Sequence, residues 1–211
     1  MAKLNIFMLL LLSSHYLLTT TAKSSTGSSP EAAAFIKAEC RATRYPALCV
    51  QCLSNYTTTI QLSQRQLAQA ALSVSLARAQ AAASFVSKLA RIKAGMKPTE
   101  YGAVRDCIEN MGDTTDQLSR SMKELGAMGR VAGQDFDWHV SNVQTWVSAA
   151  LTNENTCLDG FASVEMDGSL KVAIRRRVIS CAQVTSNALA LVNRFAARHK
   201  AGDLLDSDKI F

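Results

Sequence analysis

Apolar residues recur at alternating spacings of three and four positions along most of this 211-residue chain. That spacing places them on one face of an α-helix, so it indicates helices that bury one side. The clearest series comprises Val104, Ile108, Met111, Thr115, Leu118, Met122 and Leu125. Similar series run through positions 136–150 and 174–195, whereas no comparable window alternates with a period of two. The pattern therefore predicts an all-α fold.

Four long helices are expected along the chain. The segment 59–94 contains neither proline nor glycine, which predicts one helix that ends at Gly95. Pro98 suits the first turn of a second helix, and further helices are expected at about 134–152 and 169–199. Because the connections are short, the four helices should form an antiparallel up-and-down bundle.

A smaller unit precedes the bundle. Residues 31–56 contain short apolar segments interrupted by Pro46, which cannot sit inside a helix without the loss of a hydrogen bond. We expect an N-terminal helical hairpin that turns at positions 44–46. The bundle domain then covers 57–199, and 200–211 are expected to form a loose C-terminal tail.

The N-terminus has the organisation of a secretory signal peptide, predicted at 1–22. Lys3 supplies the positive charge, an apolar stretch covers 4–18, and Ala22 is a small residue suited to cleavage. A membrane anchor is the alternative, but two serines and a histidine interrupt the apolar stretch, which is short for a span. Residues 23–30 are rich in serine and are expected to be a flexible start.

Composition and charge narrow the class of partner. Hydrophobic residues make up 48% of the chain, enough for one well-packed domain, and the net charge is +6. A basic secreted protein meets acidic polysaccharide rather than nucleic acid, and we expect neither a nucleic-acid nor a membrane partner. The run Arg175–Arg177 lies on the polar side of the fourth helix and is a candidate for weak contact with acidic polysaccharide.

Secreted cysteines are candidates for disulfides, and six of them allow fifteen complete pairings. They are Cys40, Cys49, Cys52, Cys107, Cys157 and Cys181. The two arms of the hairpin should bring Cys40 and Cys49 together. Antiparallel second and third helices should likewise bring Cys107 close to Cys157. The sequence therefore predicts disulfides Cys40–Cys49 and Cys107–Cys157.

The other two cysteines have no predicted partner. Cys181 lies on the apolar series of the fourth helix, which favours a buried free thiol. Cys52 forms a C-x-x-C pair with Cys49, but no βαβ pattern accompanies it, so redox chemistry is not expected. The state of Cys52 stays open.

No catalytic, cofactor or metal site is expected. The mature chain has only His139 and His199, in different helices, so a zinc site has too few ligands. No Gly-rich phosphate loop and no nucleophile elbow occur. Trp138 and Trp146 are interpreted as packing residues.

One group of carboxylates carries a functional hypothesis. An acidic stripe adjoining the apolar series of the second helix consists of Asp106, Glu109, Asp113 and Asp116. Solvated surface, a contact for a partner protein and acid–base chemistry are the three interpretations, in that order. Separately, Asn55 begins the sequence Asn-Tyr-Thr and is a candidate for N-glycosylation.

Taken together, several motifs resemble the plant invertase and pectin methylesterase inhibitor family, over roughly 30–198. They are Tyr45-Pro46 inside the Cys40/Cys49 hairpin, Arg105-Asp106-Cys107, the stretch 113–118, Thr145–Thr152 leading into Thr156–Phe161, and Ser186–Asn193. The resemblance is greatest to the subgroup described as 21 kDa proteins. It implies a four-helix bundle behind a helical hairpin, with one disulfide in each and an unpaired Cys181. Cys52 departs from the pattern.

The resemblance also implies a function. Members of the family are not enzymes; one branch inhibits pectin methylesterase through a one-to-one complex that covers the active-site cleft, with contacts that include Thr156. Asp113 and Asp116, followed by Asp106 and Glu109, are further interface candidates. The Pro-Lys-Phe motif of the invertase branch is missing at 97–101. We therefore expect an apoplastic pectin methylesterase inhibitor that is a monomer when free.

Three alternatives accompany that expectation. The protein could inhibit cell-wall or vacuolar acid invertase. It could instead inhibit no enzyme and make weak contact with acidic pectin of the wall through Arg175–Arg177 and other basic residues. The pro-region of a pectin methylesterase is the third, since such pro-regions resemble the same family.

Overall fold

The computed structural model describes residues 29–91, 96–128, 133–162 and 168–207. The predicted signal peptide and positions 23–28 of the flexible start lie outside these ranges. Within them every regular element is helical, in the order α2 (Pro30–Cys40), α3 (Pro46–Leu53), η1 (Ser54–Tyr56), α4 (Thr57–Ile60), α5 (Gln64–Arg91), α6 (Pro98–Ala127), α7 (Gly133–Asp159) and α8 (Gly168–Ser207). In these ranges no helix combines the length and the apolar character that a membrane span needs.

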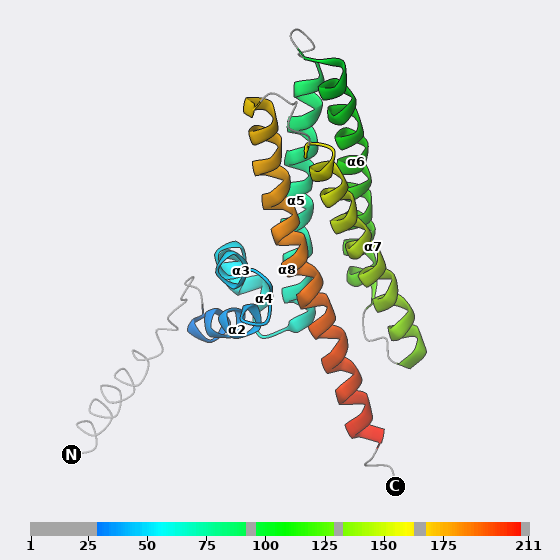
Figure 1. The fold of residues 1–211 in the computed structure, drawn as a ribbon. Helices are drawn as coiled ribbons and strands as arrows, with labels where there is room; N and C mark the ends of the chain where they lie inside the picture. Colours follow the sequence, from blue (N-terminus) through cyan, green and yellow to red (C-terminus); the bar gives the residue numbers. More distant parts are fainter. Residues whose placement is uncertain (1–28, 92–95, 129–132, 163–167, 208–211) are drawn as a thin grey trace, which may run out of the picture.

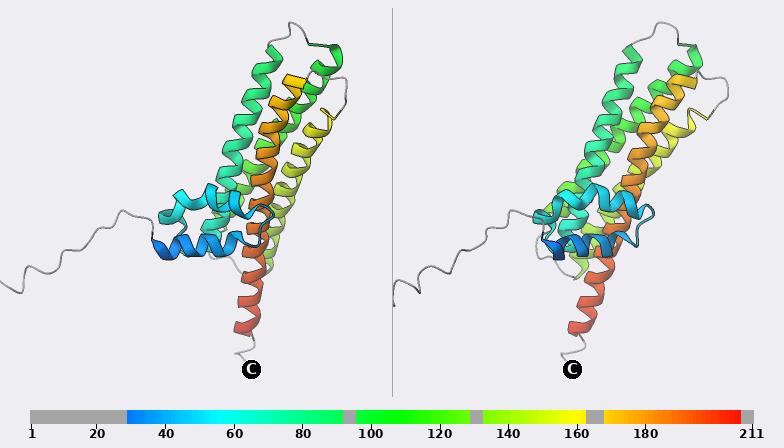
Figure 2. Two further views of the ribbon diagram at one scale, coloured as in Figure 1. Left: turned by 60° about the vertical axis from the view of Figure 1, so that its left-hand side comes forward. Right: turned by 90° about the vertical axis from the view of Figure 1, so that its left-hand side faces the viewer.

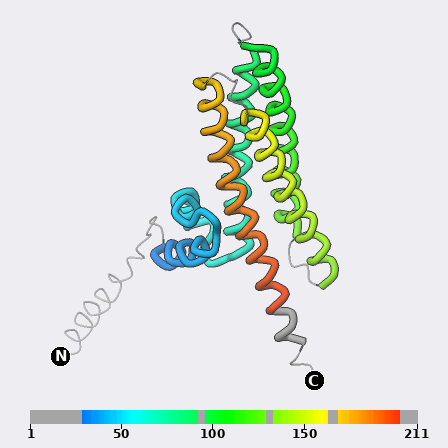
Figure 3. Tube along the Cα trace, in the orientation of Figure 1, coloured from blue at the N-terminus to red at the C-terminus, as the bar shows by residue number. Residues whose placement is uncertain are grey.

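The four long helices form the predicted up-and-down bundle. Each of α5, α6 and α7 packs against the next helix in the chain, and α8 closes the arrangement by packing against α5. The chain ascends and descends along neighbouring helices, as the tube in Figure 3 shows. The interior is lined by aliphatic side chains from all four helices, among them Leu72, Met111, Val147 and Ile174, each fully buried.

The first long helix begins later than the sequence analysis predicts. The four-residue α4 ends at Ile60, and α5 begins only at Gln64. Gln61 has a φ of 50°, a left-handed conformation that non-glycine residues seldom adopt and that ends a helix. Because neither proline nor glycine marks this break, the pattern of residues did not reveal it.

The buried face of α6 is also rotated relative to the predicted one. Cys107, Thr114 and Ser121 are fully buried, whereas Ile108, Thr115 and Met122 are only half-buried. The two buried hydroxyl groups donate to carbonyl oxygens of their own helix, at 2.9 Å each, so burial leaves them satisfied. The Thr114 hydroxyl oxygen also lies 3.4 Å from the Ala150 carbonyl oxygen of α7, so α6 and α7 approach closely on this face.

Helices α7 and α8 both extend past their predicted ends. Helix α7 continues through Asn153–Asn155 to Asp159, because Glu154 and Cys157 point into the core. Helix α8 continues to Ser207, so 200–207, predicted as a loose tail, are helical. The Lys200 ammonium lies 2.9 Å from the Asp137 carboxylate and ties the extension to α7.

The N-terminal hairpin packs across α5 and α8 near one end of the bundle (Figure 2). Glu39 is 4% exposed, and its carboxylate accepts hydrogen bonds from Arg194 at 2.9 Å and Arg198 at 2.8 Å. Asn187 of α8 exchanges two hydrogen bonds of 2.9 Å with the backbone of Tyr45 in the hairpin turn. Polar contacts with α8 therefore fix the position of the hairpin.

Candidate target-binding face

Two disulfides occur at the pairs that the sequence analysis predicts. Cys40–Cys49 closes the hairpin with a Cα–Cα distance of 5.6 Å, and Cys107–Cys157 joins the beginning of α6 to the end of α7 at 4.4 Å. The side chains of Cys107 and Cys157 are buried, whereas Asp106 and Thr156, each one residue earlier, are exposed. The second disulfide therefore holds two candidate interface residues at one end of a fixed helix pair.

The acidic stripe lies along the outer side of α6. Its four carboxylates, Asp106, Glu109, Asp113 and Asp116, are all exposed. Their spacing of three, four and three residues places them on one side of the helix, about 15 Å long at 1.5 Å per residue. The stripe points away from the core rather than adjoining the buried series, because the buried face of α6 is rotated toward Cys107, Thr114 and Ser121.

A second stripe lies along the neighbouring helix and was missed by sequence reasoning. It consists of five exposed hydroxyl residues on the outer side of α7, namely Ser141, Thr145, Ser148, Thr152 and Thr156. The Thr156 hydroxyl donates to the Thr152 carbonyl oxygen at 3.0 Å, and the Thr152 hydroxyl donates to the Ser148 carbonyl oxygen at 3.1 Å. The sequence signal for this stripe is a series of hydroxyl residues spaced three or four positions apart, with no charged residue among them.

We call the acidic and hydroxyl stripes together the α6–α7 face. The two helices run side by side and pack along most of their length (Figure 1). Trp138, at the beginning of α7, lies two turns before Thr145 on the same side of the helix. Its side chain is 67% exposed, so the interpretation of Trp138 as a packing residue is wrong, while Trp146 is half-buried.

His139, Glu124 and His199, which belong to neither stripe, each contact a neighbouring side chain. The Nδ1 of His139 lies 2.7 Å from the Oε1 of Glu124, and the side-chain amide of Asn142 donates to the same oxygen at 3.3 Å. The hydrogen bond with His139 holds the pKa of Glu124 below its ordinary value. His199 stacks on Phe136, with a ring-centroid distance of 3.6 Å. In the described part of the chain no three metal-ligating side chains gather at one point.

One carboxyl group is buried in the core between α7 and α8. Glu154 is fully buried, and its Oε1 accepts hydrogen bonds of 2.9 Å from the Cys181 thiol and from the Thr185 hydroxyl. Burial raises the pKa of Glu154 to about 7, against the effect of these two donors. Burial and the neighbouring Glu154 raise the pKa of Cys181, so this cysteine is a buried protonated thiol, as predicted.

Two further candidates lie in the hairpin region. Cys52 is a half-buried free thiol whose sulfur accepts a hydrogen bond from the Arg78 guanidinium at 3.5 Å. Asn55 is exposed within η1, a position that leaves room for a glycan. Glycosylation of Asn55 stays a prediction.

Residues 34–191 match the family model described as plant invertase/pectin methylesterase inhibitor. The chain belongs to this family. It is 50% identical over 173 residues to the 21 kDa protein of Daucus carota, covering 82% of this chain and 89% of the carrot protein. It is 53% identical over 170 residues to pectinesterase inhibitor 9 of Arabidopsis thaliana, covering 80% and 83%.

The bundle also resembles solved structures of the family. A mutant form of a pectin methylesterase inhibitor from Arabidopsis superimposes with a TM-score of 0.57 at 21% identity, covering 73% of this chain and 92% of that one. This likeness confirms the predicted helical fold, and the sequence relatives confirm the resemblance drawn from the motifs. Pectinesterase inhibitors 9 and 11 of Arabidopsis thaliana are named as inhibitors, and the chain accordingly belongs to an inhibitor family.

Proposed function

We propose that the protein is an extracellular inhibitor of pectin methylesterase that acts by non-covalent occlusion of the enzyme's active-site cleft. The relatives named pectinesterase inhibitors support this target, because two of them share about half of the aligned residues over at least four fifths of the chain. No relative among those compared above is named as an invertase inhibitor, and the Pro-Lys-Phe motif is missing. Secretion and a monomeric free state belong to the proposal.

The α6–α7 face is the surface that docks on the enzyme, and its geometry carries the proposal. From Trp138 to Thr156 the face extends about 27 Å along α7 at 1.5 Å per residue. That length suits an interface of standard size, which buries about 800 Å² on each partner. The hydroxyl stripe consists of short side chains that lose little conformational entropy on docking, while the buried disulfide behind it holds α6 and α7 together.

The chemistry of the face suits a cleft of a polysaccharide-binding enzyme. Hydroxyl groups can replace the hydroxyl groups of a sugar chain, and the exposed carboxylates of α6 can pair with basic or amide groups at the rim. An exposed tryptophan at the end of the stripe is the residue type that most often dominates binding energy at an interface. We assign Thr156, Asp113 and Asp116 to the contact, with Asp106, Glu109 and Trp138 around them.

A bulky substitution at Thr156 tests the assignment. Thr156→Trp should weaken inhibition of plant pectin methylesterase at mildly acidic pH, because the larger side chain holds the two surfaces apart. Thr58→Trp is the matched control, since Thr58 is an exposed threonine of α4 outside the proposed interface. Circular dichroism should show the same helical content and melting temperature in both variants.

Titration of the wild-type protein against plant pectin methylesterase and, separately, against acid invertase decides which enzyme it inhibits. Loss of pectin methylesterase activity at a near-equimolar ratio, with acid invertase unaffected, supports the proposal. Loss of invertase activity alone would transfer the function to the other branch of the family. Unchanged inhibition by Thr156→Trp would remove Thr156 from the interface.

A further inference from the structure

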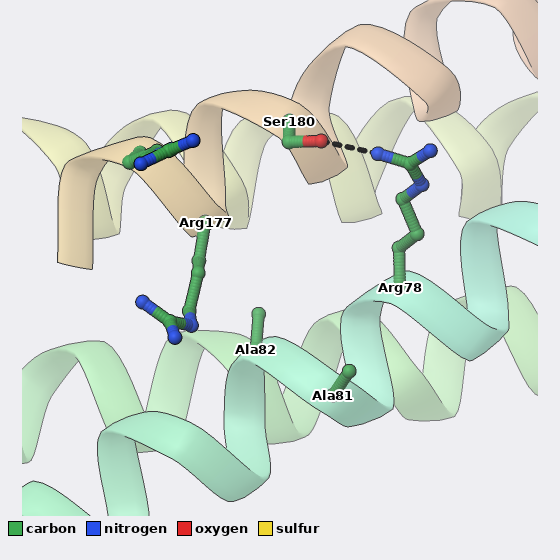
Figure 4. A pocket seen from close by; sticks show the side chains of 6 residues that line it. Arg78, Ala81, Ala82, Arg177 and Ser180 are labelled. Carbon is green, nitrogen blue, oxygen red and sulfur yellow. Dashed lines mark hydrogen bonds between the residues drawn. The ribbon is translucent and has the colours of Figure 1, made fainter. Parts of the chain in front are cut away.

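A groove on the opposite side of the bundle is lined with arginine. It has a volume of about 440 Å³ and lies between α5 and α8, where its walls are formed by Arg78, Ala81, Ala82, Arg176, Arg177 and Ser180. Figure 4 shows Arg177 reaching from α8 toward α5, and Arg78 reaching from α5 toward Ser180. Within the described residues, no acidic side chain contributes to this lining.

Two of the three guanidinium groups are held in place by the protein. Arg78 donates one hydrogen bond to the Ser180 hydroxyl and another to the Cys52 sulfur of α3. The guanidinium of Arg177 lies over the Phe85 ring, 3.6 Å from its centroid, and donates to the Ala173 carbonyl oxygen at 3.3 Å. Arginines positioned in this way lose less side-chain entropy when they bind a ligand.

The run of three arginines in the sequence divides in the structure. Arg175 turns toward α7, where it donates to the Leu158 carbonyl oxygen at 3.2 Å, whereas Arg176 and Arg177 line the groove together with Arg78 of α5. The positive cluster is therefore formed by two helices, and its third member lies about a hundred residues away in the sequence. Like charges that share a groove repel one another, and a bound anion relieves that repulsion.

We propose that this groove binds the carboxylate groups of an acidic polysaccharide of the uronate type, as in de-esterified pectin. The arginine fork matches the geometry of a carboxylate, and Ser180 is a hydroxyl partner for the sugar ring. A single phosphate or sulfate ion would occupy little of 440 Å³, whereas the volume is in the range of ordinary ligand pockets and admits sugar rings attached to the carboxylate. Ala81 and Ala82 leave the floor open to a ring.

The groove and the α6–α7 face can be occupied at the same time. Helix α5 packs against α6, and α8 against α7, so the α5–α8 side lies opposite the α6–α7 side of the bundle (Figure 1). Binding to de-esterified polymer would retain the inhibitor where an esterase has acted. The proposal is independent of the enzyme target, because it concerns a different surface.

Binding of a short oligogalacturonate to the oxidised mature protein, measured by calorimetry at low ionic strength, tests the proposal. The double variant Arg176→Gln/Arg177→Gln should bind at least about tenfold more weakly, since it loses two charged hydrogen-bond donors. The control Arg105→Gln/Arg120→Gln removes the same charge from exposed positions of α6 and should bind nearly as the wild type does. Equal weakening of oligogalacturonate binding in the two double variants would overturn the assignment of this groove as the binding site.

A second pair of variants does not depend on the packing of Arg177. Ala81→Glu places a carboxylate in the groove, where it should compete with the ligand and abolish binding. Gln80→Glu adds the same charge one residue earlier, outside the lining, and should leave binding largely intact. Failure of the wild type to bind oligogalacturonate, or persistence of binding in Ala81→Glu, would overturn the proposal.

The ligand class is tested with two further probes. A fully methyl-esterified oligogalacturonate should not bind, because it lacks the carboxylate, and inorganic phosphate should compete only weakly. Tighter binding of phosphate than of oligogalacturonate would refute the uronate assignment. Inhibition of pectin methylesterase by the two groove variants should equal that of the wild type, which separates failure at this site from failure of the proposed function.

Discussion

Replacement of the buried Glu154 by glutamine should remove a large part of the dependence of stability on pH. The carboxyl group is fully buried between α7 and α8, and its pKa rises from 4.5 to about 7 on folding. Glutamine keeps nearly the same shape and an oxygen that can accept from Cys181 and Thr185, but it does not ionise. The substitution therefore isolates the charge from the packing.

The sign of this pH dependence follows from the difference in proton binding between the folded and unfolded states. Between pH 4.5 and 7 the folded state keeps the proton on Glu154, whereas the unfolded state has released it. Folding therefore binds a proton, and the free energy of unfolding falls as the pH rises through this window. The contribution of Glu154 is fully present below pH 4.5 and has been lost above about pH 7. At about 1.4 kcal/mol for each pH unit, the loss is about 3 kcal/mol.

The other charges near this carboxyl group do not reverse the direction. Cys181 keeps its proton throughout the window, because its own pKa is raised by burial and by Glu154. Arg78 of α5 favours the ionised form of Cys181, but its contribution is smaller than that of burial. The protein should consequently be more stable in acidic surroundings than at neutral pH.

Denaturant unfolding of wild type and Glu154→Gln between pH 4.5 and 8 provides the measurement. The difference between the two should change by about 3 kcal/mol across this range, equivalent to a shift in melting temperature of roughly 6–12 °C. Glu109→Gln, at an exposed site of α6, is the control and should follow the wild type. Parallel curves for wild type and Glu154→Gln would refute the assignment of the pH dependence to this residue.

Two further predictions concern the connections between elements. Cys107→Ser and Cys157→Ser should each lower the free energy of unfolding by about 4 kcal/mol, since the disulfide closes a loop with a sequence separation of 50 residues; unchanged melting temperatures in both would argue against the bond. Asn187→Ala should cost about 2 kcal/mol through two lost hydrogen bonds to the hairpin turn. It should raise hydrogen exchange in α2 and α3 while the bundle core stays protected, whereas Asn193→Ala, at an exposed position of α8, should not.

Much of the fold could be predicted from local rules. Apolar spacing identified three of the long helices, the absence of proline and glycine identified the first, and Pro46 located the hairpin turn, because these signals act within a few residues. The up-and-down order followed from short connections, and that order made Cys107 and Cys157 neighbours. The expectation that Thr156, which precedes Cys157, contacts a target enzyme came from the family resemblance.

Other features required knowledge of what lies opposite each helix. The polar residues at 153–155 predicted a helix end. In the structure α7 continues, because Glu154 is buried and accepts hydrogen bonds from Cys181 and Thr185 of α8. Trp138 was interpreted as a packing residue, yet its side chain is exposed on α7. The hydroxyl stripe had a regular spacing but no feature that marked it as exposed.

The sequence alone determined which residues share a face of a helix, since that depends on a period of 3.6 residues and on the ends of each helix. Only the tertiary structure decided which faces meet and which remain open. It turned Arg175 toward α7, joined Arg176 and Arg177 to Arg78, and left the outer sides of α6 and α7 uncovered. The reason is that packing joins residues far apart in the chain, and the periodicity of one helix contains no information about its neighbour.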